Sequence, residues 1–133
     1  FYESGKTRSI GISNFNVKDT EAILETCRIR PMVNQIKLHI GHPQEEITAF
    51  CRKNNILVEG YSPLATGRIL NNGEIARIAE KYGRSVAQLS VRYVLQKGAL
   101  PLPKSVHPEY IRQNFDINFE ISADDISLLD SLK

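Results

Sequence analysis

Three short polar segments of this 133-residue chain contain side chains that could bind a ligand. Ser13-Asn14 and Tyr61-Ser62 each end an apolar, β-branched run, and Lys104-Ser105 lies shortly before Pro108, a residue that suits the start of a helix. An ammonium group and a hydroxyl before a helix suit an anion, and a flat aromatic ring at a strand end suits a planar ligand. The alternatives are ordinary: a turn at Ser13-Asn14, a core aromatic at Tyr61 and a solvated lysine at Lys104.

The histidines and cysteines do not indicate a metal site. His39 and His42 have no partner at metal-ligand spacing, and we expect His39 to be structural. Cys27 and Cys51 each lie in a helical pattern. We interpret them as small core residues of a protein in the reducing cytosol, with a disulfide as the alternative. A cytoplasmic location is therefore expected.

Composition limits the classes of partner. The chain has 17 Lys and Arg against 15 Asp and Glu, a net charge of +2. The basic residues are scattered, so we expect no nucleic-acid or membrane partner. No apolar run approaches the roughly 20 residues that a membrane helix needs. The length suits a single domain over residues 1–133.

The elements that must position these side chains alternate between strand and helix. Strand patterns cover Ser9–Ser13, Val33–Leu38, Ile56–Tyr61 and Leu100–Pro103, and a helical pattern follows each of them. The prolines at 101 and 103 predict a short last strand, because proline cannot donate to a ladder.

Helix boundaries are marked by capping residues. Asn16 is expected to cap the first helix, Pro43 to open the second and Ser85 to cap a helix over Val86–Leu95. Another helix is expected over Ile75–Tyr82, after a loop that spans Gly67 to Gly73. Glycines 83 and 98 suit the positions just past two helix ends. Ser122 with Asp125 three residues on predicts a capping box for the last helix.

This alternation predicts an α/β fold with a parallel sheet. No Gly-x-Gly-x-x-Gly follows any strand, so the usual dinucleotide fingerprint is absent. A (β/α)8 barrel runs to about 250 residues, so four parallel β/α units in this length amount to about half a barrel.

Four segments in order resemble the second half of the aldo-keto reductase barrel. Gly5–Phe15 resembles the family signature around the fifth strand, Val33–Gln35 the sixth strand and Glu59–Leu64 the seventh. Leu102–Val106, followed by Arg112–Phe115, resembles the eighth strand and its helix. The resemblance implies the C-terminal half of a (β/α)8 TIM barrel. It also implies reversible hydride transfer between NADP(H) and a small-molecule carbonyl or alcohol.

The resemblance assigns the nicotinamide end of the cofactor to strand ends. Ser13, Asn14 and Gln35 would bind the carboxamide, and Tyr61 would stack under the ring. Ser62 and Leu64 would lie along the pyrophosphate. The Gly67–Gly73 segment would then fold over the cofactor, with a plain surface loop as the alternative.

The adenosine end is implied for the last strand and its helix. Lys104 and Ser105 match the site of the adenosine phosphate of NADP, and Gln113 and Asn114 match the pair that binds adenine. Tyr110 stands where many family members have an arginine that stacks on adenine and pairs with the phosphate. A tyrosine keeps the stacking but not the charge. NADP is therefore the expected cofactor, and NAD is possible.

Catalysis in the family depends on a tyrosine, a lysine, an aspartate and a histidine in the first half of the barrel. No residue here matches those motifs, so no catalytic residue is assigned. Three hypotheses follow: a piece of a longer reductase, a natural half-barrel that binds nucleotide or protein without catalysis, and a structural subunit with a vestigial site. We favour the first because Phe1–Gly5 resembles the tail of a helix. In the half-barrel, unpaired edges and an apolar inner face predict self-association or binding to the missing half.

Overall fold

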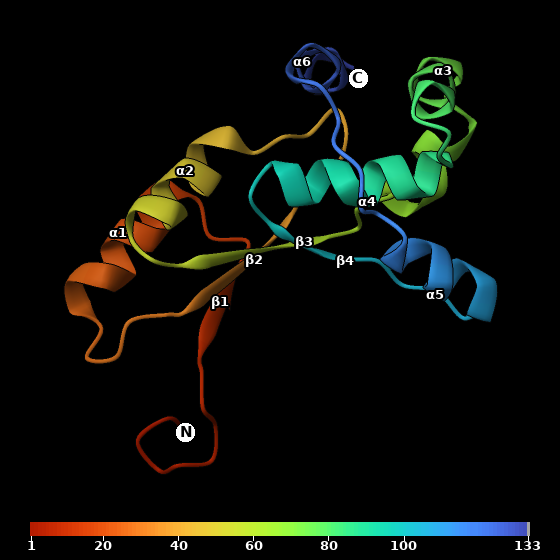
Figure 1. Ribbon diagram of the computed structural model, residues 1–133. Helices are drawn as coiled ribbons and strands as arrows, with labels where there is room; N and C mark the ends of the chain where they lie inside the picture. The colour runs from red at the N-terminus through yellow and green to blue at the C-terminus, as the bar shows by residue number, and fades with distance from the viewer. Residues whose placement is uncertain (133) are drawn as a thin grey trace.

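The computed structural model describes residues 1–132. In chain order the elements are β1 (Gly11–Ser13), α1 (Val17–Thr26), β2 (Val33–Lys37), α2 (Glu45–Lys53), β3 (Leu57–Tyr61), the 3-10 helix η1 (Ala65–Asn71), α3 (Gly73–Lys81), α4 (Val86–Gln96), β4 (Leu100–Leu102), α5 (Pro108–Phe115) and α6 (Ala123–Ser131). The four strands form one parallel sheet in the order β1-β2-β3-β4 (Figure 1). The predicted α/β fold of four parallel β/α units is confirmed.

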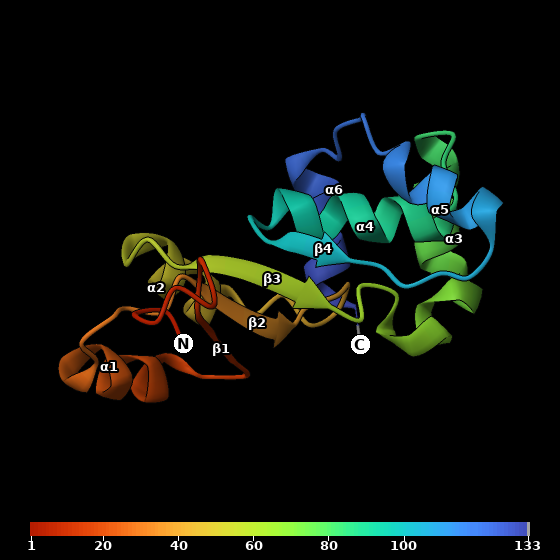
Figure 2. The same cartoon turned by 90° about the horizontal axis from the view of Figure 1, so that it is seen from below.

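The helices cover one face of the sheet and leave the other open. Figures 1 and 2 show α1, α2, α4 and α6 on the same side, and in the view from below β4 lies in front of α4. Alternate strand residues follow this division: Asn34, Ile36 and Val58 are buried toward the helices. Gln35 and Glu59, between them, are half-buried on the open face.

The core lies between the sheet and α2, α3, α4 and α6. Leu38, Cys51, Leu89, Val94 and Leu129 are fully buried there. Gly60 allows α4 to approach β3 closely, because a Cβ at this position would lie 2.8 Å from Cγ1 of Val94. A side chain at position 60 would push α4 away from the sheet.

Side-chain caps begin the helices where the sequence predicts them. The side chain of Asn16 accepts from the backbone N–H of Asp19 at 2.9 Å. Ser85 and Gln88 form a complete capping box at the start of α4. At the chain's start, Lys6 N–H donates to Phe1 and Gly5 N–H to Tyr2, as at a helix C-terminus with glycine in the left-handed conformation. This pattern agrees with the helix tail predicted for this segment.

The predicted capping box of α6 is half correct. The Ser122 hydroxyl accepts from the backbone N–H of Asp125 at 3.3 Å. The Asp125 carboxylate does not reach back to the backbone of Ser122. It accepts instead from Lys81 Nζ at 2.7 Å, from the Tyr82 hydroxyl and from the Ser122 hydroxyl at 3.0 Å. The bond from Lys81, followed by that from Tyr82, lowers the pKa of Asp125 below its ordinary value. The carboxylate thus joins α3 to α6.

Two ion pairs of Lys97 hold α6 against α2 and α4. Lys97 Nζ lies 2.7 Å from Oε1 of Glu45 and 2.9 Å from Oδ2 of Asp130. The Tyr93 hydroxyl also donates to Asp130. Burial, aided by this carboxylate, raises the pKa of Tyr93 above its ordinary value.

Several predicted boundaries were wrong. β1 begins at Gly11 rather than Ser9, since the register places Ser9 opposite Pro31, which has no N–H. Helix α2 begins at Glu45 and not at Pro43, because Gln44 has left-handed backbone at φ 52°. β2 ends at Lys37 rather than Leu38, and β4 ends at Leu102 rather than Pro103. β3 begins at Leu57 rather than Ile56, because the Ile56 N–H bonds to the Cys51 carbonyl near the end of α2.

The segment predicted as a loop from Gly67 to Gly73 is mostly helical. Residues Ala65–Asn71 form η1, kinked by left-handed backbone at Thr66 and Gly67. Gly73 opens α3, with Asn72 as its cap. Helix α3 ends at Lys81 and α4 extends to Gln96.

Two further expectations concern buried side chains. Cys51 is a core residue as predicted, whereas Cys27 is the half-buried C-cap of α1 and lies outside the core. His39 is buried, and its Nδ1 lies 2.7 Å from the carbonyl of Ile40, in keeping with a structural role.

The open face is mixed rather than apolar. Leu57, Leu100 and Leu102 are exposed there, but Ser13, Gln35, Lys37 and Glu59 occupy the same face. The inner face that was predicted to be apolar is therefore only partly apolar.

Candidate functional site

The candidate site lies at the carboxyl ends of the strands, which a parallel sheet places at one edge. β1 ends at Ser13, β2 at Lys37 and β3 at Tyr61. Ser13 pairs with Gln35, and Tyr61 pairs with Lys37. The register thus brings together the predicted residues Ser13, Asn14, Gln35 and Tyr61 from three strands.

Gln35 is oriented by a residue on the next strand. Its Nε2 donates to Oε2 of Glu59 at 2.9 Å. A carboxylate accepts hydrogen bonds and donates none, so the amide nitrogen must face Glu59. The Oε1 of Gln35 is left as an acceptor, and it has no hydrogen bond to any residue in the described part of the chain.

The end of β1 is tied to β2 through the same glutamine. The backbone N–H of Asn14 and the hydroxyl of Ser13 both donate to the carbonyl of Gln35, at 2.9 and 3.1 Å. Asn14 has left-handed backbone at φ 57°, a conformation that asparagine tolerates. Its exposed side-chain amide makes no hydrogen bond within residues 1–132, which leaves a donor and an acceptor free next to the end of β1.

Tyr61 and Ser62 make a comparable bend at the end of β3. Tyr61 is half-buried on the open face of the sheet. Ser62 has left-handed backbone at φ 53°, which costs a residue with a Cβ about 1 kcal/mol. The Ser62 carbonyl accepts from the N–H of Ala65 at 2.9 Å, and Leu64 is the N-cap residue of η1. Such local strain clusters at functional sites.

The remaining predicted residues follow β4. Lys104 is exposed, and the Ser105 hydroxyl accepts from the N–H of His107 at 3.1 Å, at the start of α5. Lys104, Ser105 and Asn114 line a cavity of about 720 Å³ between α4, β4 and α5. Tyr110 is exposed, with its ring 5.2 Å from that of His107 and nearly perpendicular to it. Gln113 is exposed on the same helix.

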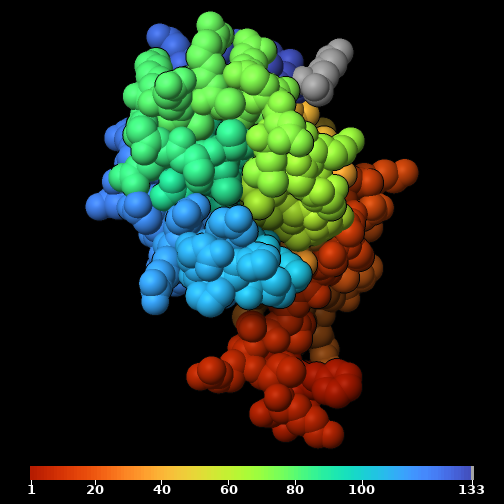
Figure 3. All heavy atoms as spheres, turned by 90° about the vertical axis from the view of Figure 1, so that its right-hand side faces the viewer, coloured from red at the N-terminus to blue at the C-terminus, as the bar shows by residue number. Residues whose placement is uncertain are grey.

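The residues at the strand ends lead into η1, and this segment adjoins the residues that follow β4. In Figure 3 the surface of the segment around η1 borders that of the segment between β4 and α5. A long ligand could therefore pass from the strand ends across η1 to α5.

The free groups at the strand ends match the chemistry of a nicotinamide carboxamide. A carboxamide needs one acceptor for its NH₂ group and one donor for its oxygen. Oε1 of Gln35 is such an acceptor, and the side-chain amide of Asn14 contains such a donor. The aromatic face of Tyr61 suits a flat ring, and Lys104 suits a phosphate. The residues present thus fit a nicotinamide dinucleotide.

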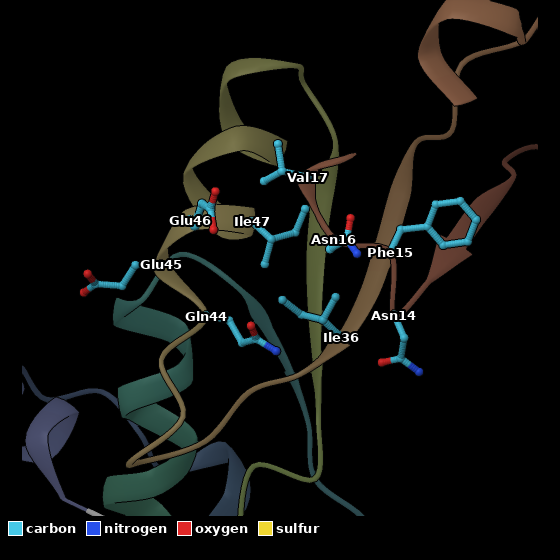
Figure 4. A pocket seen from close by; sticks show the side chains of 9 residues that line it. All are labelled: Asn14, Phe15, Asn16, Val17, Ile36, Gln44, Glu45, Glu46 and Ile47. Carbon is cyan, nitrogen blue, oxygen red and sulfur yellow. The ribbon is translucent and has the colours of Figure 1, made fainter. Parts of the chain in front are cut away.

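A separate cavity near Asn14 does not belong to this site. It has a volume of about 350 Å³ and lies between the starts of α1 and α2. Figure 4 shows Ile36, Gln44 and Ile47 around it, with the ring of Phe15 directed away from Ile47. Of the predicted cofactor residues it contains only Asn14, and Glu45 and Glu46 at its wall disfavour a phosphate.

Glu59 is a site residue to which sequence reasoning gave no role. Its alternation with Tyr61 places both residues on the open face, and the register places Glu59 opposite Gln35. The alternation was visible in the sequence, but the register was not.

Two kinds of feature are not found within residues 1–132. No three His, Cys, Asp or Glu side chains lie close enough together to hold a metal ion. None of the described helices has the length and apolar character needed to cross a membrane.

Comparison with known proteins identifies relatives over the whole chain. The model of the aldo/keto reductase family matches residues 1–133. The glyoxal reductase of Bacillus subtilis is 42% identical over 132 residues, which are 98% of this chain and 48% of the relative. The 9,11-endoperoxide prostaglandin H2 reductase of Trypanosoma cruzi is 36% identical over 135 residues, with the same coverage. The chain thus spans about half the length of the curated relatives that it matches.

Solved structures agree in fold. MGS-M4, an aldo-keto reductase from a deep-sea metagenome library, matches with a TM-score of 0.90 at 37% identity and covers 98% of this chain and 49% of that one. A variant of Gox0644 in complex with NADPH matches with a TM-score of 0.88 at 39% identity, over 97% of this chain and 48% of that one. The four parallel β/α units are half of such a barrel. This chain belongs to the aldo-keto reductase family.

Proposed function

We propose that this chain supplies the cofactor-binding half of an NADPH-dependent reductase of small aldehydes and ketones. The observation that carries the proposal is the convergence of Asn14, Gln35 and Tyr61 on three neighbouring strands: Asn14 follows β1, Gln35 lies opposite the last residue of β1, and Tyr61 ends β3. Oε1 of Gln35 and the side-chain amide of Asn14 have no hydrogen-bond partner within residues 1–132, and Tyr61 is half-buried on the same face of the sheet as Gln35. The NADPH complex of Gox0644, 39% identical to this chain, supports the same cofactor here.

Each predicted residue has a binding role in this proposal. Asn14 and Gln35, steadied by Ser13, hold the carboxamide and so determine which face of the nicotinamide points to the substrate. Tyr61 supports the other face of the ring. When bound, NADPH supplies the hydride that reduces the carbonyl carbon.

The outer residues hold the rest of the cofactor. Ser62 and Leu64 border the diphosphate, and Lys104 with Ser105 binds the adenosine phosphate. Tyr110, Gln113 and Asn114 on α5 contact the adenine. NADH is a weaker alternative cofactor, because Lys104 favours a phosphorylated ribose.

The proton donor for the developing alkoxide belongs to the other half of the barrel in this proposal. General acid catalysis needs a group placed within hydrogen-bond reach of the carbonyl oxygen. We assign no such residue in this chain. Glyoxal is the first substrate to test, because the glyoxal reductase shares 42% identity with this chain.

The open face of the sheet is the surface that we propose for the other half. β1 and β4 are the edge strands, and each has one side unpaired within the described sheet. In the absence of the other half, a second copy of the chain is the expected partner.

We place the protein in the cytoplasm, since free Cys27 and Cys51 suit a reducing compartment.

NADPH titration of the chain tests the proposal. Circular dichroism first establishes that the chain and its variants are folded, and cofactor fluorescence then measures binding. Gln35→Ala and Asn14→Ala should each weaken NADPH binding by about fivefold or more. Asn118→Ala, at an exposed position away from the site, should leave it unchanged. Absence of NADPH binding by the folded chain would overturn the proposal.

A further inference from the structure

A third cavity lies between the turn after β2 and η1. It has a volume of about 320 Å³, and its lining includes Lys37, His39, His42, Arg68 and Asn72. None of the residues proposed for the cofactor lines it. No Asp or Glu is among the described residues of its wall. The positive charges of Lys37 and Arg68 are therefore not neutralised by a carboxylate within the cavity.

The turn that contains both histidines is held rigidly. The backbone groups of His39 and His42 bond to each other in both directions, at 2.8 and 3.4 Å. Gly41 takes the left-handed conformation at φ 76°, as a tight turn with glycine in its third position requires. The Gly41 N–H donates to the carbonyl of Leu129 on α6 at 3.1 Å. The two imidazole rings are thereby kept 5.4 Å apart.

Polar groups in the wall remain available as donors. Oδ1 of Asn72 accepts from the N–H groups of Glu74 and Ile75, so its Nδ2 is left for another partner. Nδ1 of His39 is bonded to the carbonyl of Ile40, which makes Nδ1 the protonated nitrogen of the neutral ring. The other ring nitrogen, Nε2, is then the one that can take up a proton.

Lys37 and Arg68 both lie near the buried His39 ring. Lys37 and Arg68 form no ion pair with any carboxylate in the described part of the chain. Burial lowers the pKa of His39, and the neighbouring His42, Lys37 and Arg68 lower it further by electrostatic repulsion of its charged form, against the bond to Ile40 that raises it. These groups come from β2, the turn and η1, so three segments direct positive charge at one buried ring.

We propose that this cavity binds a small oxyanion, a phosphate or carboxylate group, between Lys37, His39, His42 and Arg68. The anion would replace the missing carboxylate partner of Lys37 and Arg68. It would also accept from Nδ2 of Asn72. Because Lys37 and Arg68 belong to different segments, a bound anion joins the turn after β2 to η1. The site shares no residue with those proposed to contact the cofactor directly, although Arg68 and Asn72 belong to the Gly67–Gly73 segment.

Histidine NMR of the chain, with inorganic phosphate as the probe at constant ionic strength, tests this proposal. Phosphate should cause saturable shifts of the His39 and His42 resonances. It should also raise the pKa of His39, because the anion offsets the positive charges of Lys37 and Arg68. Lys37→Gln and Arg68→Gln should each weaken phosphate binding by about three- to tenfold. Arg77→Gln removes the same charge from an exposed position on α3 and should have no effect. A parallel titration with acetate distinguishes a carboxylate ligand from a phosphate.

Two outcomes would overturn the proposal. One is the absence of a saturable shift at both histidines with phosphate and with acetate. The other is an equal loss of affinity in Arg77→Gln, which would mean general screening of charge. NADPH, followed by its own fluorescence, should bind equally well with and without phosphate. Competition between the two would contradict an independent site, whereas failure of NADPH to bind would count only against the proposed function.

Discussion

Gln35 on β2 donates to Glu59 on β3 across 2.9 Å, on the face of the sheet that the helices leave open. The bond holds the amide nitrogen of Gln35 toward Glu59 and leaves the amide oxygen, Oε1, free to accept from a ligand. Glu59 therefore acts on the proposed cofactor site through Gln35 and is a positioning residue.

Replacing Glu59 with alanine should weaken NADPH binding by about three- to tenfold, since a half-exposed charge-assisted bond contributes about 1 kcal/mol. Glu59→Gln keeps an acceptor for Nε2 and should retain most of the affinity. Leu57→Ala, on the same strand and face, is the matched control. Equal affinity in Glu59→Ala and the parent chain, measured by cofactor fluorescence, would show that Gln35 needs no support.

The chain by itself should not reduce aldehydes with NADPH. Hydride transfer needs a proton donor and charge stabilisation at the carbonyl oxygen, and we assign neither to this chain. Loss of NADPH absorbance measures the activity, with mass spectrometry to verify the chain. Turnover should appear when the complementary half of a relative is added. Steady turnover by the chain alone would contradict this prediction.

Tyr110→Arg should increase the preference for NADPH over NADH by about tenfold, because it adds one charge-assisted contact to the adenosine phosphate. Tyr110→Phe keeps the ring and should leave the preference unchanged. Both affinities are measured by titration of the two cofactors. If the arginine brings no gain, another group, such as Lys104, already supplies the charge.

The isolated chain should self-associate through the open face and the edges of the sheet. Sedimentation equilibrium should show an average mass that rises with concentration. Leu57→Lys places a charge on the open face, where Leu57 is 49% exposed, and should weaken association. Leu70→Lys changes a residue of η1 that is 43% exposed and should not. A single monomer mass at all concentrations, with protected amides in β1, would mean that the edges are covered internally.

Asp125→Asn should lower the midpoint of thermal unfolding by several degrees, because it removes the charge that binds Lys81 and Tyr82. The pKa of Asp125 in the folded chain is lowered from 3.8. Its stabilisation is therefore present above pH 3.8 and is lost as the pH falls through the folded value. The difference between the parent and Asp125→Asn should shrink over that acidic range.

Asp124→Asn is the matched control for this measurement. Asp124 lies in the same first turn of α6 but is exposed, so its substitution should have a much smaller effect. Equal losses in the two variants would indicate a helix-dipole effect rather than the contacts of Asp125.

The sequence by itself determined the succession of strands and helices, most of the caps and the family. These features depend on local periodicity, on side chains such as Asn16 and Ser85 that bond within one turn, and on motifs such as Glu59–Leu64. They could be predicted because each is contained in a short stretch of chain. Some boundaries failed because a partner far along the sequence decided them, as Pro31 did for the start of β1, and others because of local backbone conformation, as at Gln44 before α2.

Only the tertiary structure decided which side chains meet. The register of β2 on β3 places Glu59 beside Gln35, and a shift by one residue would move Glu59 to the helix-covered face. The cluster of Lys37, His39 and Arg68 likewise depends on how η1 packs beside the turn after β2. Contacts of this kind join residues from separate segments, and hydrophobic periodicity, which reports the buried face of one segment, does not specify them.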